Sequence, residues 1–137
     1  MSYIDIHDMP GGQRDHIVIP LTLAADMTES YAIWHAPFDC KIRDIVVVWS
    51  ASLTGGAVNY TRVTVTNRGT AGAGADVLAT VNYNSGAITG FDAYALYDPA
   101  TYLSVDSGTV ISVELIVGGG AGENMPPAAI FVVYEGR

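Results

Sequence analysis

Apolar and polar residues alternate along most of this chain, and no segment shows a sustained 3.6-residue apolar period. The stretch HIVIPLTLA (16–24) is an example, with two faces made of Ile17, Ile19, Leu21 and Leu23 on one side and His16, Val18, Pro20 and Thr22 on the other. Successive side chains of a strand point to opposite faces of a sheet, so this pattern indicates a half-buried strand. We therefore expect the chain to build its core from strands.

Further segments have strand character and follow one another at short spacing: 30–37, 40–52, 60–67, 76–84, 91–97, 109–117 and 128–136. Residues 91–97 also fit a single helical turn, and 97–103 reads as a turn that runs into a short strand. Gly, Pro, Asn and Asp separate the segments, which is typical of an all-β sandwich or barrel. About eight strands with several long connections favour an all-β antiparallel sandwich that is jelly-roll-like.

Three segments carry predictions about their place in the sheets. Pro20 cannot donate a hydrogen bond to a neighbouring strand, so it predicts an edge strand or a break. Residues 45–49 are apolar on both faces, as expected for a central strand of a sandwich. In 76–84 the alternation places four residues on one face: Val77, Ala79, Val81 and Tyr83.

The length of 137 residues suits one domain. Residues 1–15 contain Pro10, Gly11 and Gly12 and show no sustained periodicity, so we predict an N-terminal arm. Residues 16–137 then form a single β-sandwich domain. Neither an internal repeat nor a linker divides this region.

The formal net charge of −8 argues against several classes of partner. Nucleic-acid binders carry clustered basic groups, whereas the six Lys and Arg residues here are scattered. We therefore expect neither nucleic acid nor an anionic membrane as a partner. A start without a basic and then an apolar segment is not a signal peptide, and the single Cys40 allows no intrachain disulfide. These features predict a soluble protein made in a cytoplasm.

The glycine-rich stretch TNRGTAGAGAD (66–76) could cradle a phosphate or could simply turn the chain. A phosphate-binding loop follows a buried parallel strand and opens a helix, but here both flanking segments alternate like antiparallel strands. The spacing G-x-x-G-x-G of Gly69, Gly72 and Gly74 is also the reverse of the dinucleotide fingerprint. We predict a hairpin connection in which glycines permit positive φ.

Two groups of residues have the chemistry of a reactive site. Carboxylates and imidazoles could hold a divalent metal in a set near the N-terminus: Asp5, His7, Asp8, Asp15 and His16. The spacing of this set matches no known site, and a solvated arm is the favoured interpretation. His35 and Cys40 lie five residues apart without a nucleophile signature, so we predict a packed or partly exposed histidine and a small buried cysteine.

The acidic and aromatic residues offer weaker candidates. Acids for glycoside hydrolysis or calcium binding fall mostly in turns, and nothing selects a pair among Asp39, Asp76, Asp98, Asp106 and Glu123. Trp34 and Trp49 could stack on a sugar, although aromatic residues in strands more often pack in a core or an interface. We therefore assign no catalytic residue, no cofactor and no metal ligand, and we predict that the chain is not an enzyme.

A longer pattern of strands and turns begins with CKIRDIVVVWSASLTGGAVNYTRVTVTNRGTAGAG (40–74) and continues with VLATVNY (77–83), LSVDSGTVISVE (103–114) and MPPAAIFVVYE (125–135). This pattern resembles small head-associated proteins of tailed bacteriophages. The resemblance spans roughly residues 15–135. The chain departs from the pattern at Ser107 and Thr109, where the phage proteins commonly have Gly-Asp around the turn.

The resemblance implies a virion structural protein, and first of all a decoration or cement protein on the outside of a phage head. Such proteins commonly form homotrimers at local threefold positions and clamp neighbouring major capsid subunits. The implied location is the capsid surface of a virion assembled in a host cytoplasm. The alternative is a carbohydrate-binding jelly-roll module of a tail or receptor-binding assembly.

Overall fold

The computed structural model describes residues 13–20, 22–85, 87–119 and 124–137. Within these ranges the chain forms strands and no helix, so it has no helix that could cross a membrane. The strands are β1 (Gln13–Ile19), β2 (Thr28–His35), β3 (Cys40–Trp49), β4 (Leu53–Thr54), β5 (Tyr60–Gly69), β6 (Asp76–Tyr83), β7 (Ala87–Ile88), β8 (Ala93–Tyr97), β9 (Leu103–Val105), β10 (Val110–Gly118) and β11 (Ala128–Gly136).

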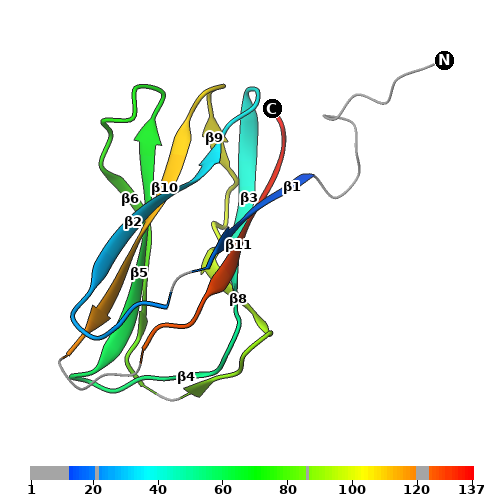
Figure 1. Cartoon of the computed structure of the whole chain (residues 1–137). Helices are drawn as coiled ribbons and strands as arrows, with labels where there is room; N and C mark the ends of the chain where they lie inside the picture. The colour runs from blue at the N-terminus through cyan, green and yellow to red at the C-terminus, as the bar shows by residue number, and fades with distance from the viewer. Residues whose placement is uncertain (1–12, 21, 86, 120–123) are drawn as a thin grey trace.

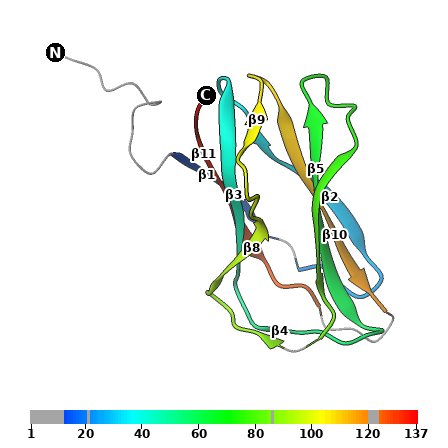
Figure 2. The same cartoon turned by 180° about the vertical axis from the view of Figure 1, so that it is seen from behind.

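Two antiparallel sheets face each other, as Figures 1 and 2 show from opposite sides. The first sheet has the order β1-β11-β3-β8, and β9 pairs with the other end of β3. The second sheet has the order β2-β10-β5-β6, while β4 and β7 form a small separate pair. The predicted all-β antiparallel sandwich is therefore confirmed.

The chain crosses between the two sheets at nearly every connection. Only the β5–β6 connection joins neighbouring main strands of the same sheet, and the first and last main strands, β1 and β11, pair with each other. Crossing connections of this kind arise from Greek keys, which are the units of a jelly roll. The strand order is thus consistent with the jelly-roll-like arrangement.

The core lies between the sheets and is built from the inward faces of their central strands. Alternate residues of β3 and β10 are completely or almost completely buried: Ile45, Val47 and Trp49, and Ile111, Val113, Leu115 and Val117. Because β3 lies between β11 and β8, its assignment as a central strand is confirmed. Its outward residues Val46 and Val48 are only half-buried, and they belong to the surface described below.

The first strand begins earlier than the sequence predicts. Residues 13–15, which we assigned to the arm 1–15, form the first part of β1, where Gln13 pairs with Tyr134 and Asp15 with Val132. The rest of the predicted arm lies outside the described residues. β1 is an edge strand and ends at Ile19, so Pro20 marks both an edge strand and the end of that strand, as predicted.

The predicted face of β6 is wrong at one residue. Val77 is 54% exposed, whereas Leu78 packs against the core. The register of β6 on β5 shifts at this point, because Val65 pairs with Ala79 and the next residue of β5 pairs with Val77. A β-bulge of this kind inserts an extra residue and reverses the alternation beyond it.

The ambiguous segment 91–97 forms β8 from Ala93 onward, and the short strand predicted near its end is β9. Phe91 itself precedes β8 and adopts φ of +66°. The two-residue strands β4 and β7 were not predicted, because two residues carry no period. The acidic Asp92 and the aromatic Phe91 are both exposed at this turn.

The glycine-rich stretch connects antiparallel strands β5 and β6, so the prediction of a hairpin connection is confirmed. Gly69 and Gly72 adopt φ of +69° and +76°, which disfavours side chains. Gly74 has a different constraint: its N–H donates to the Arg68 carbonyl at 2.9 Å, and a Cβ there would lie 2.9 Å from the same backbone.

We expect Gly72→Ala and Gly74→Ala each to lower the free energy of unfolding by about 1–2 kcal/mol. Strained φ is the cause at Gly72, and close backbone approach is the cause at Gly74. Gly56→Ala is the control, since its Cβ would meet only an ordinary contact at 3.6 Å. Urea unfolding followed by fluorescence measures all three, and equal effects of the three substitutions would contradict this explanation.

Candidate functional site

The outer face of the first sheet carries two neighbouring rows of mainly apolar residues. Its outward residues form rows across β1, β11, β3 and β8: His16, Phe131, Val46 and Ala95 in one row, and Val18, Ala129, Val48 and Ala93 in the next. His16 packs its ring on Phe131 at a centroid distance of 5.6 Å. We call the apolar members of these rows, together with Phe91, the outer apolar face.

The corresponding face of the second sheet is polar. Its outward rows run across β2, β10, β5 and β6 and contain Ser30, Glu114, Thr64 and Thr80, and then Thr28, Ile116, Arg62 and Asn82. Seven of these eight side chains can hydrogen-bond to water. The two outer faces therefore differ in kind: one suits solvent and the other suits contact with apolar groups.

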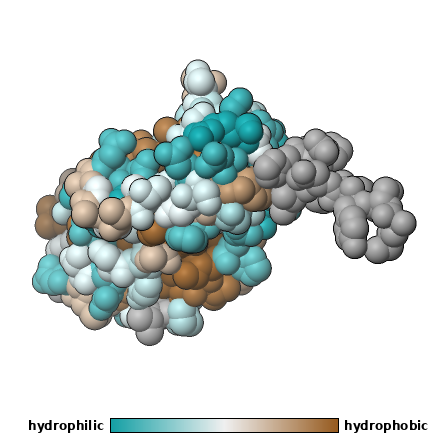
Figure 3. Space-filling model, turned by 90° about the horizontal axis from the view of Figure 1, so that it is seen from above, coloured by the Kyte–Doolittle hydropathy of each residue, from teal (hydrophilic) through white to brown (hydrophobic). Residues whose placement is uncertain are grey.

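Large apolar side chains on the outer apolar face remain accessible. Val18 is 58% exposed and Phe91 is 77% exposed. Both line a shallow apolar hollow of about 190 Å³, together with Val48, Pro127 and Ala129. In the view of Figure 3, the largest hydrophobic patch is bordered by polar residues, and smaller hydrophobic areas lie elsewhere on the surface. Gathered apolar surface is typical of an interaction site.

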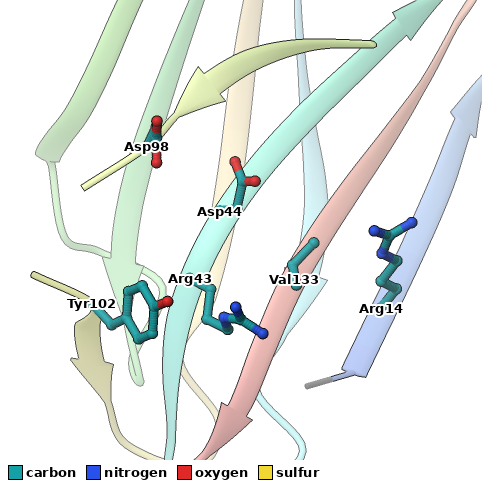
Figure 4. A pocket seen from close by; sticks show the side chains of 6 residues that line it. All are labelled: Arg14, Arg43, Asp44, Asp98, Tyr102 and Val133. Carbon is teal, nitrogen blue, oxygen red and sulfur yellow. The ribbon is translucent and has the colours of Figure 1, made fainter. Parts of the chain in front are cut away.

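A polar hollow of about 400 Å³ adjoins the outer apolar face. Its lining is shown in Figure 4 and consists of Arg14, Arg43, Asp44, Asp98, Tyr102 and Val133. One row of the sheet places Arg14 beside Val133 and Val133 beside Asp44. Arg43 is the extra residue of a bulge on β3, and its guanidinium lies 5.3 Å from the centre of the Tyr102 ring.

Asp44 is the most constrained group of the polar hollow. Its Oδ1 atom is enclosed and accepts no hydrogen bond from the described residues. Burial raises the pKa of this carboxyl, and Asp98 raises it further, whereas the guanidinium groups of Arg14 and Arg43 lower it. An enclosed acceptor without a donor is unfavourable.

The structure separates the two described members of the metal candidate set. The Asp15 carboxylate accepts a hydrogen bond of 2.9 Å from the Trp34 indole N–H, while His16 lies on the outer face against Phe131. Adjacent strand residues point to opposite faces, so the two side chains diverge. Asp5, His7 and Asp8 lie outside the described residues. Among the described residues no cluster of three metal-ligating side chains occurs.

His35 and Cys40 occupy different environments. His35 is exposed at the end of β2, whereas Cys40 is completely buried at the start of β3. Burial raises the pKa of the Cys40 thiol to about 11, so the thiol is protonated at neutral pH. The prediction of a partly exposed histidine and a small buried cysteine is confirmed.

Two of the acids predicted in turns join the C-terminal residue. Arg137 forms ion pairs with Asp39 at 3.4 Å and with Asp106 at 2.9 Å, and Asp39 also accepts from the Ser107 N–H at 2.8 Å. These contacts tie the β2–β3 and β9–β10 turns to the end of β11. Among the other acidic candidates, Asp98 enters the polar hollow, and Glu123 lies outside the described residues.

Both tryptophans are core residues, as the sequence favoured. Trp49 is completely buried and meets the Tyr83 ring edge-on at 5.7 Å, and Trp34 packs on Tyr134 at 5.1 Å. Neither indole is placed to stack on a sugar. The exposed aromatic side chains at this side of the molecule are Phe91 and Tyr102.

The raised pKa of the Tyr134 hydroxyl leads to a prediction about stability at alkaline pH. Burial, and then the hydrogen bond and charge of Asp15, raise the pKa of Tyr134 to about 12. Since an unfolded tyrosine has a pKa of about 10, the folded state holds this proton more tightly. The protonated Tyr134 hydroxyl contributes to the stability of the folded state below pH 10, and this contribution is lost as the pH rises from about 10 to 12. We expect the free energy of unfolding to fall in that window.

Chemical unfolding at a series of pH values measures this effect. Tyr134→Phe removes the hydroxyl and keeps the ring packed on Trp34. The variant should show a shallower loss of stability between pH 10 and 12. An identical loss in the two proteins would contradict the assignment to Tyr134.

No protein family matches the chain, and no curated protein sequence matches it. Weak structural similarity exists to PirA, known from a crystal structure, with 11% identity over 92% of this chain and 96% of that chain and a TM-score of 0.41. A chain in the structure of infectious bursal disease virus Gt strain has 13% identity and a TM-score of 0.34, with 88% of this chain and 32% of that chain covered.

A chain of the Gx strain of the same virus has 14% identity and a TM-score of 0.31, with 100% of this chain and 37% of that chain covered. The present chain thus spans about a third of the length of both virus chains. Since these TM-scores lie below 0.5, the similarities support no inference about family or function.

Proposed function

We propose that this chain is a virion structural protein, specifically a decoration or cement protein that binds the outside of a tailed-phage head and stabilises it. Its partners would be the major capsid protein and further copies of itself in a trimer. It would reside on the capsid surface, after synthesis in the host cytoplasm, and carry out no catalysis. The sequence pattern shared with phage head-associated proteins supports this proposal.

The single observation that carries the proposal is the contrast between the two outer sheet faces. Monomeric soluble proteins rarely expose contiguous rows of Val, Ala and Phe on an open sheet face. A protein that is one subunit among many needs such a face, and needs a solvent face opposite to it. The outer apolar face and the polar rows of the second sheet match these two requirements.

The N-terminal arm has a second role in the proposal. β1 begins at Gln13, next to Arg14 in the polar hollow, so residues 1–12 are attached at the rim of the outer apolar face. We assign these residues to contact with the major capsid protein. Deleting residues 1–12, rather than 1–15, tests this role, because it keeps β1 whole.

Sedimentation of the purified protein with heads of the virus that encodes it tests the proposal. We expect saturable binding at a fixed ratio to the major capsid subunit, and weaker binding after deletion of residues 1–12. Heads with bound protein should also resist heating better than bare heads.

Absence of binding to heads would refute decoration. If the protein instead bound glycans in the same experiment series, the carbohydrate-binding alternative would replace it. In that case the exposed rings of Phe91 and Tyr102 would be the sites to test, since both tryptophans are buried.

A further inference from the structure

Phe91 has a backbone conformation that its side chain does not favour. Its φ is +66°, in the left-handed region that a bulky residue rarely adopts. The ring gains little burial in return, because the residue is 77% exposed. Strain that the fold does not repay by burial is characteristic of residues held for a function.

Several hydrogen bonds hold the Phe91 backbone in place. The Phe91 N–H donates to the Trp49 carbonyl at 2.7 Å, and the Gly90 N–H donates to the Ser52 hydroxyl at 3.1 Å. The Thr89 N–H donates to the Tyr94 hydroxyl at 2.8 Å. A Cβ at position 90 would lie 2.8 Å from the backbone of Ala51. The backbone of the turn is therefore packed tightly against the end of β3.

An apolar hollow that could receive such a ring from another copy lies on the same face. The shallow apolar hollow beside Phe91 is lined by Val18, Val48, Pro127 and Ala129. An exposed aromatic ring next to an apolar hollow suits an exchange between identical subunits, in which each ring enters the hollow of a neighbour.

The charges of this face also fit a second copy. The polar hollow contributes two guanidinium groups, of Arg14 and Arg43, and two carboxylates, of Asp44 and Asp98, which sum to zero. The whole chain carries −8, so two copies repel each other at most other orientations. A face with balanced charges of both signs can meet itself, with an arginine of one copy facing an aspartate of the other.

We propose that a second copy of this chain covers the outer apolar face, and that Phe91 is the anchor of the contact. The proposal rests on the proposed function in that both require a covered face, but it names the occupant of that face. Phe91 of each copy inserts into the apolar hollow of the next copy. The arginines of one polar hollow face the aspartates of the next copy. The backbone at Phe91 is held before association, so the contact costs less conformational entropy than one made by a loose loop.

Analytical ultracentrifugation over a range of concentrations tests the proposal on the full chain. The unchanged protein should sediment as a multiple of the monomer. Phe91→Gly removes the ring and relieves the strained φ, so the dissociation constant should rise at least about 30-fold, while the free energy of unfolding, measured at a concentration at which both proteins are monomeric, does not fall. Phe91→Tyr keeps the ring and should still associate. Val77→Ser, at an exposed valine of the other sheet, is the matched control and should associate normally.

A monomer at every concentration would overturn the proposal, as would a Phe91→Gly variant that associates like the unchanged protein. The result is separable from the head-binding experiment. If the protein is a monomer and binds heads, this proposal is contradicted and the decoration function is retained. If the protein associates with itself and does not bind heads, this proposal is supported and decoration is refuted.

Discussion

Replacement of Val48 with lysine is expected to reduce the amount of protein bound to heads at least about 30-fold, because it places a charge at the centre of the contact between copies, and copies that no longer associate lose the gain in affinity that comes from binding together. Val48 lies between Ala129 and Ala93 in one row of the outer apolar face. An ammonium group there must be desolvated when another subunit covers the face. In the isolated subunit the side chain can extend into water, so the free energy of unfolding should change by about 1 kcal/mol or less.

Thr64→Lys is the matched control for this substitution. Thr64 occupies the same central place on the outer face of the second sheet, between Glu114 and Thr80. Its replacement should leave head binding unchanged. Equal losses for the two variants would mean that the outer apolar face has no special role, and unchanged binding of the Val48 variant would remove the basis of the proposed function.

Trp49→Ala is expected to lower the free energy of unfolding by about 3–5 kcal/mol, the largest effect on stability that we predict. The Trp49 side chain is completely buried between the sheets and packs edge-on against Tyr83. Its removal leaves a cavity that well-connected strands on both sides cannot close. A loss of this size is a large part of the stability of a small domain.

Urea unfolding at equilibrium measures the effect, followed by circular dichroism because the variant loses a fluorophore. Val77→Ala is the control, since this valine is largely exposed and should change stability by no more than about 0.5 kcal/mol. If Trp49→Ala unfolds too readily to measure, Trp49→Phe, which keeps an aromatic ring, should show a smaller loss. A change below 1 kcal/mol for Trp49→Ala would place the centre of the core elsewhere.

The parts of the fold that depend on local pattern could be predicted from the sequence. Alternation located the main strands, the two-sided apolar run 45–49 identified the central strand β3, and Pro20 marked the edge strand β1. The glycine-rich stretch was assigned to a hairpin because both its flanks alternate. These features depend on residues that lie close together in the sequence, so a local pattern is enough to predict them.

The bulges could not be predicted, and they decide two details of the surface. One bulge turns Val77 outward, and another adds Arg43 to β3 beside the polar hollow. A bulge depends on how two strands align, which alternation within one strand does not record. The ion pairs of Arg137 with Asp39 and Asp106 could not be predicted either, because they join residues that are distant in the sequence.

The outer apolar face was partly visible in the sequence. Residues 45–49 and 128–133 are apolar on both faces, and for 45–49 we attributed this pattern to a central strand of a sandwich. Only one side of each strand faces the other sheet, so the second side forms part of the outer apolar face. The strained φ of Phe91 left no sequence signal, because nothing in FDAYALY distinguishes a turn residue from the first residue of a strand.

Hydroxyl-radical footprinting of the protein, first diluted until it is monomeric and then bound to heads, tests most directly whether the outer apolar face is covered in the particle. We predict that Phe91 and Phe131 become protected on heads, whereas Val77 and Tyr60 of the second sheet react as they do in the monomer. Reactivity of Phe91 and Phe131 on heads equal to that in the monomer would contradict this prediction.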